Sequence, residues 1–377
     1  MKNITYIFGG GRLEKINDQH NFAKDFYYGF HLLKNSKKYD TKILEIYPFT
    51  KSKTKFLKVL QKVDLLLTRL IFLQFHFHEI YIKENLRRIK NSDVLIFSND
   101  RLAFSFFPIL KFNKNIKSIV FVMGLLKKHE NLKIYQKILR PIFLSLFIKT
   151  VDKFIFLGKS EYEFALKRYP QHKEKFIFIS FAVDYSFWNL NKKENEKINN
   201  QVLFIGNDGN RNYEFIKELP KYLPEFNFII ISDQIKDYEQ QKNVNFVAGN
   251  WSKGYMSDKE LGKYYNESFL TILPIKNTIQ PSGQSVALQS MATGTPVLIS
   301  KFDGFWEKDI FINDKNIFFI EDFNYEEWAN LIKKLNKSPQ LIDKVSLSGS
   351  NLIKKSYNLE IFVTKIEDRK SVVRERV

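Results

Sequence analysis

The chain has 377 residues, 44% of them hydrophobic and 16% aromatic, which suffices for more than one folded domain and excludes a disordered protein. It has no cysteine, so disulfides, zinc–thiolate sites and thiolate nucleophiles are excluded. The net charge of +19 indicates attraction to anionic lipid or phosphorylated substrates. The alternative is that AT-rich codon usage favours lysine.

Apolar runs alternate with helix-length segments in the first half, which predicts parallel α/β units. The predicted strands are 3–8, 42–47, 94–97, 118–122, 153–157 and 176–179. The predicted helices are 21–34, 54–90, 132–149 and 159–169, the last with a capping box from Ser160 and Glu163.

A polar segment, 189–200 (NLNKKENEKINN), predicts a linker, and a second α/β series follows it. Its predicted strands are 201–205, 227–232, 244–247, 270–273, 296–299 and 317–320, and its helices are 212–219, 258–265, 284–292, 325–335 and 339–355. We therefore expect domains over 1–188 and 201–355, a C-terminal helix over 356–370 that crosses back to the first domain, and a tail over 371–377.

Glycine-containing loops follow two of the predicted strands. Gly9, Gly10 and Gly11 end the first strand, and with Arg12, Lys15 and His20 nearby they indicate an anion site, although a plain tight turn is the alternative. The loop 206–213 (GNDGNRNY) carries Arg211, whose guanidinium matches a phosphate, and a capping turn with a solvated arginine is its alternative.

A third segment, 277–300, has no charged residue in a lysine-rich chain, which indicates a packed site. Gly283, Gln284 and Ser285 begin a predicted helix and offer backbone amides to a diphosphate, and Gln289 lies one turn after Ser285, where it can meet a ribose. An ordinary βαβ unit is the alternative.

Membrane and metal signals are limited. The apolar runs 1–8, 70–77 and 141–148 are too short for a secretory signal or a membrane span. The segment 51–88 mixes cations with apolar residues, which suits a helix in the headgroup region of an anionic membrane, or a core helix with solvated lysines. His76 and His78 would share a strand face but have no nearby third ligand, so we expect no metal site.

Four segments resemble the signatures of the group 1, family 4-like glycosyltransferases. The segment SGQSVALQSMATGTPVLIS (282–300) resembles the Glu-x7-Glu motif that runs into Glu-Ala-Met-Ala-x-Gly-x-Pro-Val. The other three segments are FIFLGKSEYEFALKRY (154–169), FISFAVDYSFW (178–188) and VLFIGNDGNRNY (202–213). The resemblance covers roughly residues 150–355.

This resemblance implies a GT-B fold, in which two Rossmann-like domains face a central cleft. It also implies transfer of a sugar from a UDP- or GDP-linked donor to a glycan or lipid-linked acceptor, with retention and without a metal or other cofactor. Surface polysaccharide or lipopolysaccharide biosynthesis, in the cytoplasm or at the inner face of the membrane, would be its setting. The implied donor-binding residues are Gly10, Gly11, Asn207, Arg211, Gln280, Gly283, Gln284, Ser285 and Gln289.

The chain departs from the family pattern at several places. Gln289 replaces the second glutamate, Gln280 or Pro281 stands at the first, and Met123-Gly124 occupies the place of a frequent histidine. Arg211 stands where a phosphate-binding lysine is expected, and Asn207 replaces the arginine before it. No catalytic residue is therefore assigned. An inactive GT-B partner subunit is one alternative; a basic nucleic-acid-binding protein is the other, and its dispersed lysines disfavour it, so we expect no nucleic-acid partner.

Overall fold

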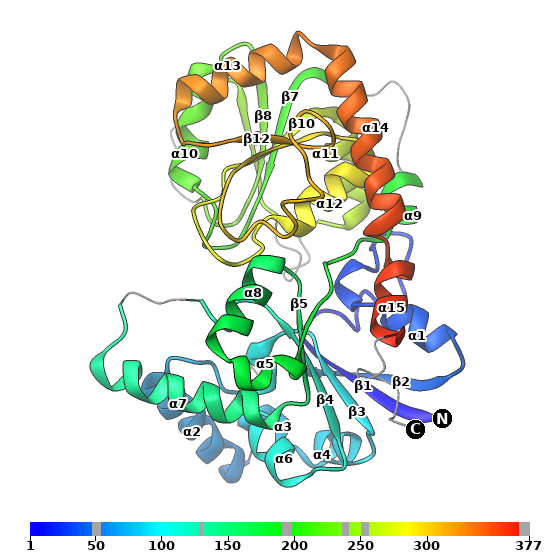
Figure 1. Ribbon diagram of the computed structural model, residues 1–377, viewed down its shortest axis with the longest axis vertical. Helices are drawn as coiled ribbons and strands as arrows, with labels where there is room; N and C mark the ends of the chain where they lie inside the picture. Colours follow the sequence, from blue (N-terminus) through cyan, green and yellow to red (C-terminus); the bar gives the residue numbers. More distant parts are fainter. Residues whose placement is uncertain (47–53, 128–130, 191–197, 236–240, 250–255, 369–377) are drawn as a thin grey trace. The chain divides into compact units, whose positions relative to one another are not determined.

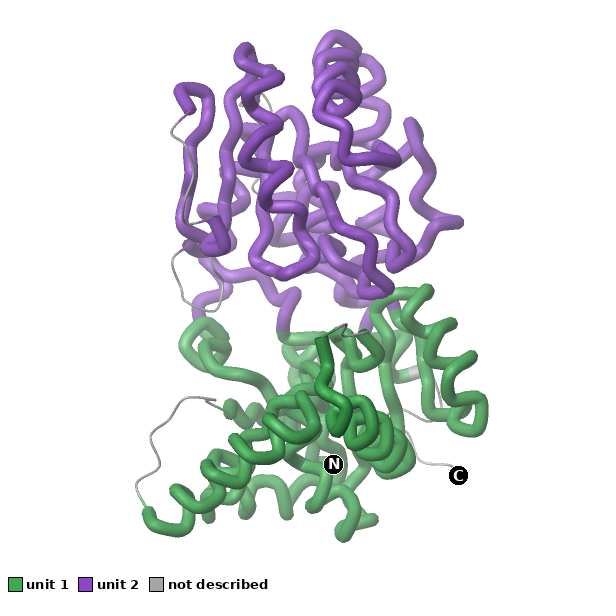
Figure 2. Tube along the Cα trace, turned by 90° about the vertical axis from the view of Figure 1, so that its left-hand side faces the viewer, with its two compact units in different colours: residues 1–17, 27–179, 363–377 green, residues 18–26, 180–362 purple. Residues whose placement is uncertain are grey.

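The computed structural model describes residues 1–46, 54–127, 131–190, 198–235, 241–249 and 256–368. The chain divides into two compact units, which are coloured separately in Figure 2. The first comprises residues 1–17, 27–179 and 363–377, and the second comprises 18–26 and 180–362. Each unit contains one six-stranded parallel sheet with helices packed on it (Figure 1).

The first sheet has the strand order β2-β1-β3-β4-β5-β6. Its inner strands are mostly apolar, as is typical of a parallel sheet with both faces covered. In β4, for example, all residues after Lys117 are buried. The strands are β1 (Lys2–Gly9), β2 (Tyr39–Ile46), β3 (Val94–Phe97), β4 (Lys117–Val122), β5 (Lys153–Phe156) and β6 (Phe176–Phe178).

Two short helices of the first unit, Asp100–Phe104 and Phe107–Phe112, have no predicted counterpart, and three predictions differ from the structure. The predicted helix 54–90 is three helices, because Phe72 ends the first in a left-handed conformation with φ 58°. The predicted helix 21–34 begins only at Phe30, after Gly29 at φ 79°. The predicted capping box is wrong: Gly158 is the N-cap, without a side-chain cap, and Ser160 lies inside the helix. The helices are α1 (Phe30–Asn35), α2 (Lys55–Ile71), α3 (Phe77–Ile80), α4 (Lys83–Lys90), α5 (Asp100–Phe104), α6 (Phe107–Phe112), α7 (Ile134–Thr150) and α8 (Lys159–Arg168).

The second sheet has the order β12-β11-β10-β7-β8-β9. Its strands are β7 (Ile198–Ile205), β8 (Asn227–Ile231), β9 (Val244–Val247), β10 (Ser268–Leu273), β11 (Val297–Ser300) and β12 (Phe318–Ile320). Its helices are α9 (Tyr185–Leu190), α10 (Tyr213–Glu218), α11 (Asp258–Glu267), α12 (Gln284–Thr293), α13 (Tyr325–Asn336) and α14 (Pro339–Ser356). Every strand predicted in both halves is present, within a few residues of its predicted ends.

The division between the units differs from the predicted boundaries. The second unit begins at Ser180 rather than after Trp188, because α9 packs against α12. The linker prediction falls mostly on 191–197, outside the described residues, and residues 198–200 already belong to β7. The last helix, α15 (Leu359–Asp368), contains the division between the two units at Val363.

The carboxyl ends of the second sheet carry the loops that concern function. In parallel α/β sheets, ligands bind outside these ends. The loops 206–212 and 274–283 follow the neighbouring strands β7 and β10, so the topology brings Arg211 and the start of α12 to the same edge.

Candidate donor-binding site

Arg211 lies at the centre of a buried polar group in the second unit. Its side chain is only 4% exposed. Its backbone forms an isolated antiparallel β-bridge with Ile275, just after β10. The guanidinium Nη1 donates to Ser282 Oγ at 2.7 Å and to Asp208 Oδ2 at 2.9 Å. The loop predicted to hold a phosphate therefore aims its arginine at the turn that begins α12, and the interpretation as a solvated arginine is wrong.

Gly206 makes this placement of Arg211 sterically possible. A Cβ on Gly206 would lie 2.7 Å from Arg211 Nε and 2.8 Å from its Cγ, closer than such contacts occur. Glycine at the end of β7 thus leaves room for the arginine side chain to pass beneath the loop.

The N-terminus of α12 lies beside this guanidinium. Gly283, the N-cap, adopts φ 80° and provides no side-chain cap to the first turn of the helix. A Cβ there would be 3.7 Å from Arg211 Nη1. The first amides of a helix have no intrahelical acceptor and carry the positive end of the helix dipole. The amides that begin at Gln284 and Ser285 therefore form, with Arg211, a site suited to an anion.

Asp208 completes the group and balances its charge. Its carboxylate also accepts a hydrogen bond from Ser282 Oγ at 2.9 Å, and its side chain is 44% exposed. A diphosphate that binds Arg211 would compete with this carboxylate for the same guanidinium nitrogen. Asp208 and Ser282 were not among the predicted donor-binding residues, although both lie in the segments that suggested the site.

Asn207 and Gln280 hold the loops around the group. The Asn207 amide donates to the Gly249 carbonyl and accepts from the Asp233 amide at 2.7 Å, which ties together the ends of β7, β8 and β9. Gln280 Oε1 accepts from Asn210 Nδ2 at 3.3 Å, which joins the two site loops. The structure therefore places both residues at the predicted site. The Asn207 side chain forms its hydrogen bonds there with backbone groups of the protein.

Gln289 lies in the second turn of α12 and is buried. Its Nε2 donates to Asp25 Oδ2 at 2.8 Å, and its Oε1 accepts from Tyr265 at 3.2 Å. The amide expected to meet a ribose therefore already has two protein partners. Asp25 was not predicted to contribute, because it lies far away in the sequence and in no recognisable motif.

Asp25 is a fully buried carboxyl surrounded by donors and other acids. It accepts from Trp188 Nε1 at 2.9 Å, besides Gln289, and from the Asp184 amide at 2.5 Å. Burial raises the pKa of Asp25 to about 7, the hydrogen bonds from Asp184 and Gln289 lower it, and the charges of Asp184 and Asp258 raise it further.

Gly10 and Gly11 belong to the first unit, so the predicted donor-binding residues do not all fall in one unit. Gly11 adopts φ 90°, as the turn after β1 requires. The next two amides, of Arg12 and Leu13, both donate to Glu45 Oε1 in β2. A carboxylate of the protein thus already occupies the anion-binding part of this loop.

The loop after β4, where the family often has a histidine, lies next to two buried acids, Asp100 and Glu161. Asp100 Oδ1 accepts from the Met123 amide at 2.8 Å. Burial, reinforced by the charge of Asp100, raises the pKa of Glu161 to about 8. Neither acid was predicted from the sequence.

Metal-binding side chains do not gather in threes among the residues that the structure describes. His76 and His78 lie at helix α3 rather than on a strand. His78 Nδ1 lies 2.6 Å from Asp64 Oδ2, and Asp64 also accepts from the Phe77 amide at 2.7 Å. The buried contact between His78 and Asp64 thus links α3 to α2.

Comparison with known proteins identifies the relatives of this fold. Residues 186–351 match the family described as glycosyl transferases group 1. No curated protein sequence matches the chain. A glycosyltransferase from Rickettsia africae shares 12% identity at a TM-score of 0.65, with 100% of this chain and 99% of that one covered.

Two further solved structures have the same fold. Sucrose-phosphate synthase from Thermosynechococcus elongatus shares 15% identity at a TM-score of 0.67, with 97% and 98% coverage of this chain and that one. HepE from Anabaena, solved with UDP and glucose, shares 12% identity at 0.66, with 99% and 100% coverage. The predicted fold class, two Rossmann-like domains of the GT-B type, is confirmed; the cleft between them stays a prediction.

Proposed function

We propose that the protein is a glycosyltransferase that transfers a sugar from a UDP- or GDP-linked donor to a glycan or lipid-linked acceptor. The match of residues 186–351 to the group 1 glycosyltransferases and the GT-B fold of the chain support this proposal. The transfer would proceed with retention and without a metal ion, in the biosynthesis of a surface polysaccharide. HepE was solved with UDP and glucose, which supports a nucleotide-linked donor.

The observation that carries the proposal is the buried Arg211 beside the N-terminus of α12, where the N-cap Gly283 provides no side-chain cap. A departing nucleoside diphosphate develops negative charge as the glycosidic bond breaks. Preorganised amides and a guanidinium stabilise such charge because they need no reorientation during the reaction. Arg211 is already fixed by Ser282 and by the packing around Gly206. These groups would therefore stabilise the leaving group.

A donor screen tests the proposal. The purified chain is heated with UDP and with GDP to find which one raises its melting temperature, and then assayed for hydrolysis or transfer with the corresponding nucleotide-sugars. Binding followed by turnover supports the proposal. Nucleotide binding without turnover of any donor indicates the inactive partner subunit, and no binding of either nucleotide contradicts the proposal.

Catalysis should survive chelation of divalent cations. If the charge of the diphosphate is met by Arg211 and the α12 amides, no cation has to bridge it. We expect the initial rate in EDTA to equal the rate in buffer within experimental error. An activity that EDTA abolishes and Mg²⁺ or Mn²⁺ restores would show that a metal holds the donor.

We also propose that the first unit binds an anionic membrane surface, where a lipid-linked acceptor would be found. Helices α2 and α7 contact each other: Gln136 Nε2 in α7 donates to the Arg69 carbonyl in α2 at 2.7 Å. Both helices expose apolar side chains in helical spacing, which include Phe56, Val59, Val63 and Leu66 in α2 and Ile134, Ile138, Ile142 and Leu146 in α7.

Charge supports this membrane surface. Helix α7 has no acidic residue, and the single acid of α2, Asp64, is buried. Lys58 and Lys62 in α2 and Lys137 in α7 lie among the exposed apolar groups. Each cation near an anionic bilayer contributes about 1 kcal/mol. Within the described residues, no helix is both long and apolar enough to cross a bilayer.

The structure narrows the segment predicted to lie on the membrane. Leu73, Phe75 and Phe77 are buried in the hydrophobic core, so the apolar run 70–77 is mostly not available to lipid. Lys51 and Lys53 lie outside the described residues. The proposed membrane surface is therefore α2 with α7, rather than one helix over 51–88.

Co-sedimentation with liposomes tests this surface. We expect binding to rise with the fraction of anionic lipid and to fall with salt, because surface charges are screened within about 10 Å at 0.1 M salt. Ile138→Glu should weaken binding, since it places a charge in the apolar row, which is 58% exposed there. Leu347→Glu, at an isolated exposed leucine of α14 in the other unit, is the matched control. Binding that depends neither on the fraction of anionic lipid nor on the salt concentration contradicts the proposal, and so does the absence of binding.

A further inference from the structure

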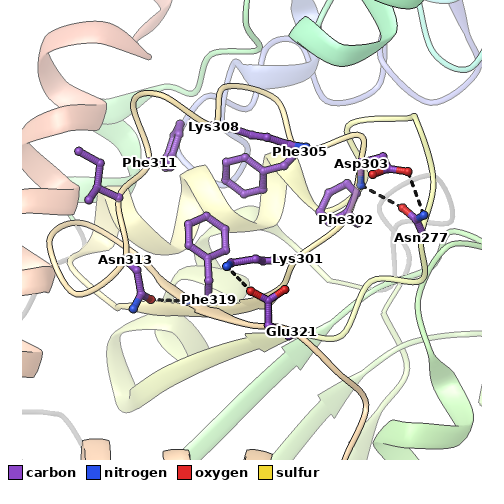
Figure 3. A pocket seen from close by; sticks show the side chains of 11 residues that line it. Asn277, Lys301, Phe302, Asp303, Phe305, Lys308, Phe311, Asn313, Phe319 and Glu321 are labelled. Atoms are coloured by element: carbon purple, nitrogen blue, oxygen red, sulfur yellow. Dashed lines mark hydrogen bonds and ion pairs between the residues drawn. The ribbon is translucent and has the colours of Figure 1, made fainter.

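The second unit contains a hollow that is separate from the proposed donor site. It has a volume of about 720 Å³, which is in the roughly 300–1,000 Å³ range of small-molecule sites. It is lined mainly by residues between β11 and β12, together with Phe319 in β12, Glu321 just after it and Asn277, and Figure 3 shows these side chains. The Asn277 and Asp303 side chains join it to the loop before α12: Asn277 Nδ2 donates to Asp303 Oδ2 at 2.9 Å, and the Asp303 amide donates back to Asn277 Oδ1.

The interior of the hollow is aromatic. Phe305 meets Phe319 edge to face at 5.0 Å between centroids and Phe311 at 5.4 Å. Phe305 and Phe311 are buried, whereas Phe319 is half-buried, so its ring is available to a ligand. In Figure 3 these rings gather at the middle of the hollow, and the polar side chains lie around them.

The rim of the hollow is polar, charged and electrically balanced. Lys301 forms an ion pair with Glu321, and Lys308 and Asp303 add one charge of each sign. The Asn313 side chain is held by the Phe319 amide, which donates to its Oδ1 at 2.7 Å. In a chain of net charge +19, a lining with no net charge does not favour an anionic ligand.

We propose that this hollow binds a neutral hexopyranose unit of the glycan on which the enzyme acts. A pyranose has an apolar C–H face that packs on an aromatic ring, and a belt of hydroxyls that both donate and accept hydrogen bonds. The half-exposed Phe319 provides the ring, and the carboxylates, amides and ammonium groups of the rim provide partners for the hydroxyls. A prenyl or lipid phosphate would need an excess of cations, which the rim does not have.

The place of the hollow fits a glycan longer than the transferred sugar. Gly304 packs so closely on the loop before α12 that a Cβ there would lie 2.4 Å from the Gln280 carbonyl oxygen, and its amide donates to the Thr278 carbonyl at 2.7 Å. The hollow and the Arg211 group are thus built on opposite ends of one stretch, 277–283. This inference rests on the proposed function for the identity of the glycan, but the binding itself does not require catalysis.

Saturation-transfer NMR with the methyl glycosides of glucose, galactose, mannose and N-acetylglucosamine tests the inference. We expect at least one glycoside to bind the full chain, with the strongest transfer to the protons of one C–H face. Phe319→Ala should weaken that binding about tenfold, the loss expected when a central aromatic contact is removed. Ile312→Glu, a second variant at the exposed edge of the hollow, leaves the rings in place and should weaken binding as well.

Phe323→Ala is the matched control, because Phe323 is a partly exposed phenylalanine that packs on Phe215 outside the hollow. The melting temperature in the presence of UDP and of GDP is measured on the same samples. An unchanged nucleotide response in Phe319→Ala, with glycoside binding lost, supports a separate sugar site. Binding of none of the four glycosides overturns the inference while leaving the donor site untouched. Binding of farnesyl phosphate in place of the glycosides would also overturn the inference. The same holds if Phe319→Ala abolishes the rise in melting temperature with UDP or GDP.

Discussion

Replacing Arg211 by alanine is expected to raise the Kd of the donor nucleotide roughly ten- to a hundredfold. A charge-assisted hydrogen bond to phosphate contributes about 1.5–3 kcal/mol, and Arg211 Nη1 lies beside the helix terminus where the diphosphate would bind. Calorimetric titration of UDP or GDP into the variant measures the loss directly. If the variant binds nucleotide as tightly as the wild type, Arg211 is not a phosphate ligand.

Three further variants separate phosphate binding from folding. Arg211→Lys keeps the charge but loses the planar fork, so its affinity should lie between those of wild type and alanine. Ser282→Ala removes only the hydroxyl that accepts from Arg211 and should weaken binding less. Asp208→Asn removes the carboxylate that competes for Nη1 and should not weaken binding at all. Weakening by Asp208→Asn equal to that by Arg211→Ala would mean that the group is needed only for folding.

The contribution of Asp25 to folding stability should decrease as the pH rises from about 4 to about 7. The folded state raises the pKa of this carboxyl from 3.8 to about 7, so it binds the Asp25 proton more tightly than the unfolded chain does. The stabilisation from Asp25 is therefore complete below about pH 4 and is lost as the pH rises through 7, by up to about 4 kcal/mol. Denaturant unfolding of the full chain at a series of pH values measures this slope.

Asp25→Asn isolates the contribution of Asp25 from that of Glu161, whose pKa is raised to about 8 and which acts in the same direction. The variant cannot ionise, so its stability should change less between pH 4 and pH 7 than that of the wild type. Asp343→Asn, at an exposed aspartate of α14, is the matched control and should keep the wild-type slope. A wild-type slope in Asp25→Asn would show that Asp25 is ionised throughout.

The parallel strands were predictable because both faces of each sheet are covered. A strand such as β3, in which every residue is buried, leaves an unbroken apolar run in the sequence. Helix ends depended on tertiary contacts instead. Phe72 leaves the helical conformation in a segment with no glycine or proline, and the chain that follows it is drawn into the core at Leu73 and Phe75. No local signal marks that turn.

The proposed donor site was predictable to the extent that it lies in two contiguous segments. Arg211 and Gly283 each follow a predicted strand, and parallel topology brings the carboxyl ends of neighbouring strands together. Asp25 was not predictable, because its contact with Gln289 joins residues far apart in the sequence. Asp208 lies three residues before Arg211 but was not predicted, because an acid beside an arginine expected to bind phosphate has no place in the family pattern.

A crystal structure of the complex with UDP or GDP, whichever stabilises the chain, would show where the diphosphate binds. We expect the diphosphate to lie against the amides at Gly283–Ser285, within hydrogen-bond distance of Arg211, and the Asp208 carboxylate to have left the guanidinium. A diphosphate bound elsewhere, with the contacts among Arg211, Asp208 and Ser282 unchanged, would contradict this expectation.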